Sequence, residues 1–524
     1  MEALERSNQE GDDGYIVKMG TFRDLQSKKD WIGKALRTKI VLTIKYNTDG
    51  SIERYKARFV ILGNHQVYGE SYEDTYAPVA SMPSVRMFIN FAAKRGLPLH
   101  QLDIMTAFLN APMDYEVDVE LDTETVTVMR ELAQELKMGE ISEETRKRIA
   151  KACYGLKQAP RMFNKSLTAY LKKLGFKNNP TEECLFKRDD KQRGSVWIIL
   201  FVDDMLIVGE KEEEVARFKK QLACKYDLKD LGLAQKFLGM KIERDDKGIK
   251  LSQGHYVKEL LERFGMQHSH PVGTPAKGNL TEKLAEAEIA RKNGEINVVE
   301  DYPVREAVGA LLYLEEMTRP DLGNAIRDLS SYVSNPTEEV VLGIKRVFRY
   351  LVGTIDKGLY FRAEGKGRLT AYCDASYAEC ILTRKSITGY VIMIDDDVVD
   401  WKSKKQSVVA QSSTEAEYIS LAMLVNRLRI ARRIREWLIG VEGAYLVYED
   451  NQACIKMAEG DGVTKRAKHI DVRYHVTREA IERGEIILEY ISTEDQVADA
   501  LTKNLGQVKF NKLALTRMLG SEGG

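Results

Sequence analysis

The sequence has few cysteines and few prolines for its length. Its 524 residues include only six cysteines and 11 prolines. The cysteines show no C-x-x-C spacing, which argues against a structural zinc site or a disulfide framework and fits a reducing compartment. The N-terminal MEALERSNQEGDDG lacks the apolar core of a signal peptide, and no run approaches the roughly 18 to 20 apolar residues that span a bilayer. We therefore expect a soluble protein without a membrane partner.

An excess of charge of one sign is also lacking. Lys plus Arg and Asp plus Glu both number 79, so the overall charge neither indicates nor excludes a nucleic-acid partner. The sequence does contain 44% apolar and 30% charged residues, which is typical of globular domains. Because the chain is longer than one hydrophobic core allows, we expect roughly three or four folding units.

One apolar segment, SVWIILFVDDMLIVGE (residues 195–210), contains two adjacent aspartates. WIILFV and MLIV have the length of buried strands, which predicts a hairpin with Asp203 and Asp204 at its turn. A turn needs one aspartate at most, and two ionised carboxylates side by side repel each other. We therefore predict that a cation binds here.

The segments before and after this hairpin predict alternating strands and helices. Residues 39–63 predict a hairpin around Asp49-Gly50 with Lys56 and Arg58 on its second strand. Residues 97–103 predict a strand that ends at Asp103. Further predictions are a helix at 84–95, surface helices within 123–151, a helix at 211–222, a hairpin at 237–249, mainly helices at 255–350, and a polar linker at 277–300. After Gly365 the order strand, strand, helix, strand, helix predicts a compact α/β domain, whose long helix begins at Ser412 and ends near Gly440.

Acidic residues recur at the ends of elements in this last domain. They are Asp374, Glu415, Asp450 and Asp499. Structural roles remain open for each, because Asp374 could begin a turn, Asp450 could cap a helix and Asp499 could lie on a solvated helix face. Glu415 follows Ser412 by three residues, the signature of a capping box. Converging carboxylates also suit Mg²⁺ pairs that catalyse phosphoryl transfer, so the acids of the two halves predict two such sites.

Ordered motifs across the chain resemble a known family. YKARFVILGNHQ, LDIMTAFLNAPM, CYGLKQAPRMFN, FVDDMLIVG and KFLGMKI resemble the reverse transcriptase of copia-type long-terminal-repeat retrotransposons. DASYAE, WKSKKQSVVAQSSTEAEY, YEDNQACIKMA, KHIDVRYH and VADALTK resemble the ribonuclease H that follows it. The resemblance covers residues 31–515 and implies an RNA-directed DNA polymerase with an associated ribonuclease.

The resemblance implies a mixed α/β and α+β multidomain fold. A right-hand polymerase with fingers, palm and thumb is followed by a ribonuclease H-like α/β domain. The expected segments are fingers and palm at 1–250, a helical thumb and connection at 251–365, the ribonuclease H-like domain at 366–510 and a C-terminal tail at 511–524.

The resemblance also assigns roles to individual residues. Asp103, Asp203 and Asp204 would hold two Mg²⁺ ions, for which Mn²⁺ is a substitute, and Phe237 to Ile242 would grip the primer. Nucleotide-binding roles fall on Lys56, Arg58, Phe108 and Gln158, where Phe108 would exclude a 2′-hydroxyl. In the second site Asp374, Glu415, Asp450 and Asp499 would bind another two ions. We expect a structural role for His469 and His475.

The implied partners are an RNA template, a DNA primer, deoxynucleoside triphosphates, the RNA–DNA hybrid and other products of the same polyprotein. The expected location is a cytoplasmic virus-like particle or the nucleus.

The sequence departs from the family pattern in two places. Phe201 replaces a commoner Tyr, and residues 123–151 lack the expected Pro-Gly-rich passage. Protease, integrase and nucleocapsid motifs are absent, so we expect a processed or truncated polyprotein piece or a genomic remnant. A silent remnant that binds nucleic acid and a ribonuclease without polymerase activity remain alternatives.

Overall fold

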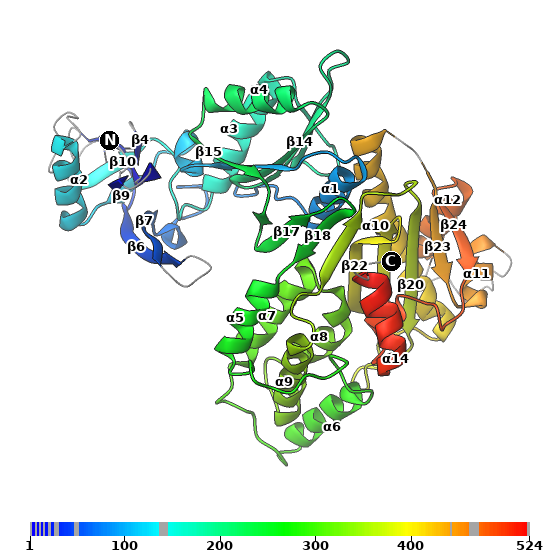
Figure 1. Cartoon of the computed structure of the whole chain (residues 1–524). Helices are drawn as coiled ribbons and strands as arrows, with labels where there is room; N and C mark the ends of the chain where they lie inside the picture. Colours follow the sequence, from blue (N-terminus) through cyan, green and yellow to red (C-terminus); the bar gives the residue numbers. More distant parts are fainter. Residues whose placement is uncertain are drawn as a thin grey trace. The chain divides into compact units, whose positions relative to one another are not determined.

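The chain forms two compact units, Met1–Ala80 with His100–Gly232 and Ser81–Leu99 with Leu233–Gly524. The computed structural model describes residues 3–5, 8–9, 12–13, 16–18, 22–25, 31–46, 52–135, 145–440, 443–460 and 471–520. Figure 1 shows the course of the chain through both units. The segment Ser81–Leu99 belongs to the second unit although it interrupts the sequence of the first. The boundaries expected at residues 250, 365 and 510 stay predictions.

The N-terminal part of the first unit is built on a five-stranded sheet. Its order is β5 (Phe22–Asp24), β10 (Arg146–Ile149), β9 (Asp118–Glu120), β6 (Leu36–Tyr46) and β7 (Ile52–Ile61). Two short pairs precede it, β1 (Ala3–Glu5) with β4 (Ile16–Lys18) and β2 (Asn8–Gln9) with β3 (Asp12–Asp13). The antiparallel pairing of β6 with β7 confirms the predicted strands of 39–63, and its turn at Asp49-Gly50 lies outside the described residues.

The insertion at 123–151 is only partly helical. Helix α2 spans Thr123–Glu135, and residues 136–144 lie outside the described residues. The prediction of helix was wrong for Arg146–Ile149, which forms β10 and pairs with both β5 and β9. The strand is stabilised by a buried charge pair, since Arg146 Nη2 lies 3.0 Å from Asp118 Oδ2.

A six-stranded sheet forms the centre of the first unit. Its order is β11 (Lys177–Asn178), β12 (Leu185–Arg188), β13 (Val196–Phe201), β14 (Asp204–Gly209), β8 (His100–Ile104) and β15 (Leu228–Leu233). The apolar runs of β13 and β14 are buried, as predicted from their length and composition. Two helices accompany this sheet, α3 (Ala159–Lys173) and α4 (Glu212–Ala223), of which α4 packs against β14. The sheet thus places the predicted hairpin, with Asp203 and Asp204 at its turn, beside β8. Asp103 lies near the end of β8.

The second unit begins with a small sheet and a group of helices. The sheet order is β16 (Lys236–Phe237), β17 (Met240–Arg244), β18 (Gly248–Ser252) and β19 (Gly358–Arg362). The helices are α5 (Gly254–Arg263), α6 (Leu280–Lys292), α7 (Val304–Met317), α8 (Gly323–Ser330) and α9 (Glu338–Val352), with a 3-10 turn at Pro320–Leu322. The prediction of a polar linker at 277–300 was wrong for α6, which buries Leu280 and Leu284. None of the described helices is both long and apolar enough to cross a membrane.

Helix α1 (Met82–Lys94) packs on strands of this second unit. Its Arg86 is 1% exposed, and Arg86 Nε donates to Val399 O at 2.8 Å. The guanidinium also lies 3.8 Å from the ring centroid of Trp401. A buried guanidinium with these partners holds α1 in the second unit, because removing it would leave buried acceptors unpaired.

The C-terminal part of the second unit is an α/β domain, as the order of its elements predicted. Its sheet order is β22 (Asp397–Lys405), β21 (Ile387–Ile394), β20 (Leu369–Ser376), β23 (Tyr445–Glu449) and β24 (Ile486–Tyr490). Strands β20 to β22 are antiparallel neighbours, and β23 is parallel to both β20 and β24. The long helix α10 (Ser413–Ile439) packs on β20 and β21 (Figure 1) and ends at Gly440, as predicted.

Four shorter helical segments complete this domain. They are α11 (Gln452–Glu459), α12 (Asp471–Glu482), α13 (Asp499–Thr502) and α14 (Gln507–Phe510). A π-helical segment, Asn511–Met518, follows and buries Leu513 and Met518. This part of the expected C-terminal tail is therefore packed in the second unit.

Candidate functional sites

The first acidic site lies at the end of the hairpin formed by β13 and β14. The antiparallel register places Asp204 directly opposite Asp103 of β8. Val202 and Asp203 form the turn, in which Val202 has a φ of 61°, and Ile104 N donates to Asp203 O at 3.0 Å. The structure thus brings together the three aspartates that the sequence indicated, from strands about a hundred residues apart in the chain.

Burial makes Asp204 difficult to ionise. It raises the pKa of Asp204 to about 7, although the Gln101 amide opposes the shift by donating to both carboxylate oxygens at 3.0 and 3.1 Å. The negative charges of Asp103 and Asp203 raise the pKa further. Such a carboxylate is stabilised by a nearby cation, and its hard oxygen donors fit Mg²⁺. Some acidic groups among the described residues have ligand atoms that all lie within 4.8 Å of one another. These three aspartates do not form such a group.

The predicted nucleotide-binding residues occupy different environments. Arg58 is half-buried on β7, opposite Val41, and the side chain of Lys56 lies outside the described residues. Phe108 is half-buried in a 3-10 turn (Ala107–Asn110) shortly after Asp103. Its ring centroid lies 4.8 Å from that of Tyr154, so the aromatic side chain is held in place by a neighbouring ring.

Gln158 does not have the exposed position that a nucleotide contact requires. Its side chain is buried with 1% exposure. Gln66 Nε2 donates to Gln158 Oε1 at 2.9 Å, and Gln158 Nε2 donates to Ser71 O at 2.9 Å. Gln158 therefore joins two loops of the first unit. The nucleotide contact that the resemblance implies for Gln158 stays a prediction, and the sequence did not indicate the partner Gln66.

The predicted primer hairpin is held by a residue that the sequence did not indicate. Strands β16 and β17 are joined through Leu238 and Gly239, which have φ values of 48° and 78°. Tyr313 Oη of α7 donates to Leu238 O at 2.8 Å. A Cβ at position 239 would lie 2.1 Å from the Tyr313 hydroxyl oxygen, so only glycine fits under this tyrosine.

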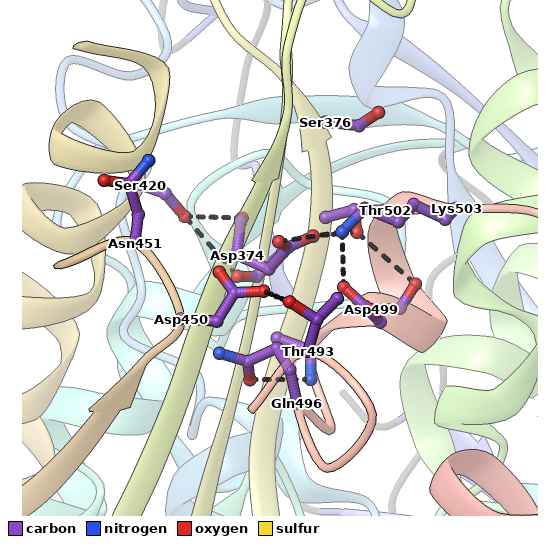
Figure 2. A network of polar contacts seen from close by, with 12 residues as sticks. Asp374, Ser376, Ser420, Asp450, Asn451, Thr493, Gln496, Asp499, Thr502 and Lys503 are labelled. Atoms are coloured by element: carbon purple, nitrogen blue, oxygen red, sulfur yellow. Dashed lines mark hydrogen bonds and ion pairs between the residues drawn. The ribbon is translucent and has the colours of Figure 1, made fainter. Parts of the chain in front are cut away.

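The second acidic site gathers three of the four predicted ribonuclease residues. Asp374 lies on β20, Asp450 directly follows β23, and Asp499 begins α13. Because β20 and β23 are parallel neighbours, the first two acids meet at one edge of the sheet. One carboxylate oxygen of each of the three residues lies within 4.8 Å of the others, and Figure 2 shows them facing one another.

Glu415, the fourth predicted residue, is not part of this group. Ser412 Oγ accepts from Glu415 N at 3.1 Å, and Glu415 Oε2 accepts from Gln411 N at 2.7 Å. These contacts cap α10 and confirm the structural alternative. The residue that sequence reasoning missed is Glu417, which is buried and lies within 4.8 Å of Glu449 and Asp450. Positions two apart on a helix point about 200° away from each other, so only one of the two glutamates can face the site.

Burial raises the pKa of several acids in this second site. The pKa of Asp374 rises to about 6 and that of Glu449 to about 8. Burial, with the charges of Glu449 and Asp374, raises the pKa of Glu417 well above its usual range. Within the part of the chain that the structure describes, Glu417 Oε2 is buried and has no hydrogen-bond partner. An unpartnered buried oxygen in a set of carboxylates fits a divalent cation with oxygen ligands.

Lysines and hydroxyl groups surround the same carboxylates. Lys503 Nζ lies 3.1 Å from Asp374 Oδ1 and 2.5 Å from Asp499 Oδ1 (Figure 2). Lys509 Nζ lies 2.8 Å from Asp499 Oδ2. Burial alone would lower the pKa of Lys503, but the charges of Asp374 and Asp499 outweigh it and raise that pKa. Sequence reasoning missed both lysines, although Lys503 follows Asp499 by one helical turn.

Three further residues were singled out in the sequence, His469, His475 and Phe201. His475 is exposed on α12, and His469 lies outside the described residues. The described candidate metal groups consist of carboxylates alone. Phe201 is half-buried and pairs with Asp204 across the hairpin turn.

Comparison with known proteins finds relatives over most of the chain. A family model described as reverse transcriptase (RNA-dependent DNA polymerase) matches residues 21–278. The retrovirus-related Pol polyprotein from transposon TNT 1-94 of Nicotiana tabacum is 34% identical over 499 residues, which cover 94% of this chain and 36% of the relative. The putative transposon Ty5-1 protein of Saccharomyces cerevisiae is 31% identical, and the match covers 62% of this chain and 99% of that protein. The chain spans about a third of the length of the Pol polyproteins that it matches.

Solved structures also show similarity at low sequence identity. A foamy viral protease-reverse transcriptase in complex with double-stranded DNA is 13% identical, with a TM-score of 0.41, and the match covers 87% of this chain and 65% of that one. An LC11-RNase H1 in complex with an RNA/DNA hybrid is 15% identical, with a TM-score of 0.21. That match covers 26% of this chain and 94% of the other.

Proposed function

Because the chain belongs to the copia-type retrotransposon Pol family and contains a reverse transcriptase domain, we propose that it copies RNA into DNA and cleaves the RNA of the resulting hybrid. The observation that carries the polymerase proposal is the register of β8 and β14, which sets Asp103 opposite Asp204 at the end of the hairpin. The substrates would be an RNA template, a DNA primer and deoxynucleoside triphosphates.

In the polymerase site Asp103, Asp203 and Asp204 would hold Mg²⁺, or Mn²⁺ as a substitute. The bound cations would lower the pKa of the primer hydroxyl and offset the charge of the triphosphate. Gln101 keeps the Asp204 carboxylate oriented through two hydrogen bonds, and the register of β8 holds Asp103 against it. Arg58 is suited to pair with phosphate oxygens through its guanidinium. Phe108, held by the Tyr154 ring, would exclude a 2′-hydroxyl by its bulk.

In the ribonuclease site Asp374, Asp450, Asp499 and Glu417 would hold the cations. The cations would activate water for attack on the RNA phosphate. Hydrogen bonds from two hydroxyl groups hold the acids in place. Thr493 Oγ1 donates to Asp450 Oδ2 at 2.8 Å, and Thr502 Oγ1 donates to Asp374 Oδ2. Glu449 accepts from Cys373 Sγ at 3.1 Å and from Asn451 N at 3.1 Å, which fixes a third carboxylate within 4.8 Å of those of Glu417 and Asp450.

A second candidate function is ribonuclease activity without polymerase activity. One observation favours it: the described carboxylate groups whose ligand atoms lie within 4.8 Å of one another belong to the ribonuclease H-like part. The two candidates differ in whether a primer is extended.

Primer extension distinguishes them. The full chain would be incubated with poly(rA), an oligo(dT) primer, dTTP and Mg²⁺, beside an Asp203→Asn variant. We expect extension by the parent and none by the variant. No extension by a folded parent that still cleaves an RNA–DNA hybrid would overturn the polymerase proposal and leave the ribonuclease as the function.

A further inference from the structure

Two lysines contact the acids that would bind metal in the ribonuclease site. We propose that Lys503, assisted by Lys509, is an internal cation that competes with the divalent metal and sets the metal affinity of this site. The proposal rests on the proposed function, since it assumes that Asp374 and Asp499 are metal ligands.

The contacts of Lys503 and its neighbours involve every carboxylate oxygen of two of the acids. Asp374 Oδ1 bonds to Lys503 Nζ, and Asp374 Oδ2 accepts from Thr502 Oγ1. Asp499 Oδ1 bonds to Lys503 Nζ at 2.5 Å, and Asp499 Oδ2 lies 2.8 Å from Lys509 Nζ. A metal ion that binds either acid would therefore lie next to an ammonium on the same carboxylates. Because two such cations repel each other, the Lys503 ammonium and a divalent metal would compete for Asp374 and Asp499.

The exposure of the side chains shows which partner can move. The side chains of Asp374 and Asp499 are 2% and 0% exposed, whereas that of Lys503 is 35% exposed. Lys503 stands at the end of α13 on a flexible four-carbon stem, so its head can swing out while the acids stay fixed by the sheet and helix. Lys509 is 21% exposed and contacts only one of the two acids through a charge pair. Lys503 is therefore the stronger competitor.

Removing Lys503 should lower the thermal stability of the metal-free protein and raise its affinity for metal. Without metal, Asp374 and Asp499 would face each other with less counter-charge, which lowers thermal stability. With metal, no ammonium would have to leave, so binding becomes tighter. A lysine that merely contacts the substrate phosphate would not change metal binding in the absence of nucleic acid. A lysine needed only for folding would lower stability with and without metal.

Calorimetric Mg²⁺ titration of the full chain tests the proposal. Asp203→Asn and Asp204→Asn would be introduced in every sample so that the polymerase site does not contribute. Against this parent we compare Lys503→Met, Lys503→Arg and Lys509→Met. The matched control is Lys512→Met, because Lys512 pairs with Asp495 at 2.7 Å and is half-exposed. Melting temperatures in EDTA and in Mg²⁺ are measured for each variant.

We expect Lys503→Met to bind Mg²⁺ about five- to tenfold more tightly, because a unit charge a few ångströms away is removed. Its melting temperature should fall in EDTA and recover in Mg²⁺. Lys509→Met should show the same signs with about a twofold effect, and so provides the test if Lys503→Met does not fold. Lys503→Arg, which keeps the charge, and Lys512→Met should match the parent.

Unchanged or weaker Mg²⁺ binding by folded Lys503→Met, or by Lys509→Met if the first variant does not fold, would overturn the proposal. Failure of the proposed function looks different. In that case Asp374→Asn would leave the binding heat of the parent unchanged, which would show that these acids are not the metal site.

Discussion

The two acidic sites of the chain differ in how their charge is balanced. In the proposed polymerase site Asp204 is half-buried at a strand end, and its carboxylate accepts from the neutral amide of Gln101. In the ribonuclease site Asp374 and Asp499 are almost fully buried and share the ammonium of Lys503. If both sites bind Mg²⁺ as proposed, the first depends on added cations for its charge balance, whereas the chain itself supplies part of the balance in the second. The carboxylates of the two sites thus lie in two different electrostatic environments.

The strongest difference between the two sites is expected for a substitution on α10. Glu417→Gln should reduce hybrid cleavage on the order of 10³-fold, because a metal ligand contributes several kcal/mol to the transition state. Primer extension should be retained. Cleavage of a labelled RNA–DNA hybrid measures the effect.

Glu415→Gln is the matched control, since it lies two positions away on the same helix. It should lower stability by about 1 kcal/mol through the weakened cap and leave the cleavage rate nearly unchanged. The reverse result, with cleavage lost in Glu415→Gln and kept in Glu417→Gln, would return the catalytic role to the residue indicated by the sequence.

A smaller effect concerns the pH dependence of the two activities. Asp204 has a pKa raised to about 7, so below pH 7 protons compete increasingly with metal for it, and extension should need more Mg²⁺. Above pH 7 this requirement should level off. Glu417 has a pKa raised much further, so metal binding at the second site must release its proton even above pH 7.

The Mg²⁺ concentration for half-maximal activity, measured from pH 6 to pH 9, tests this difference. For hybrid cleavage it should keep falling above pH 7, by up to about tenfold per pH unit for one proton released. For extension it should be nearly constant there. Identical pH profiles for the two activities would contradict the difference between the sites.

The smallest expected effect concerns Gln158. Gln158→Ala removes two hydrogen bonds and leaves buried partners on Gln66 and Ser71, so it should cost about 2 kcal/mol of unfolding free energy. The KM for dNTP should stay within about twofold of the parent, because the amide is buried. Gln192→Ala, on an exposed loop, is the control in the same unit. A KM that rises strongly without loss of stability would restore the nucleotide contact implied by the resemblance.

The parts of the structure that were predictable from sequence depend on local patterns. The apolar runs of β13 and β14 define two strands, and their turn fixes Asp203 beside Asp204. Asp374 and Asp450 were found because Asp374 lies near the end of β20 and Asp450 directly follows β23. Glu417 was missed because SSTEAEY contains two glutamates, and only the packing of α10 on β20 decides which one faces the site.

Contacts between residues far apart in the sequence could not be predicted either. Lys503 bonds to Asp374, which lies 129 positions earlier. Arg86 donates to Val399 O across 313 positions, so the sequence of α1 does not reveal that this helix belongs to the second unit. Gln158 pairs with Gln66 across 92 positions. Such contacts depend on tertiary packing, which a single sequence does not specify.

The most direct test of two separate metal-dependent sites uses one substrate for both activities. A labelled RNA template with a recessed DNA primer would be incubated with dNTPs and Mg²⁺, and primer elongation and RNA cleavage would be followed in the same samples. The parent, Asp204→Asn and Asp374→Asn would be compared after each is shown to be folded. We expect Asp204→Asn to lose elongation and keep cleavage of preformed hybrid, and Asp374→Asn to show the opposite. Loss of both activities in either folded variant would contradict the existence of two independent sites.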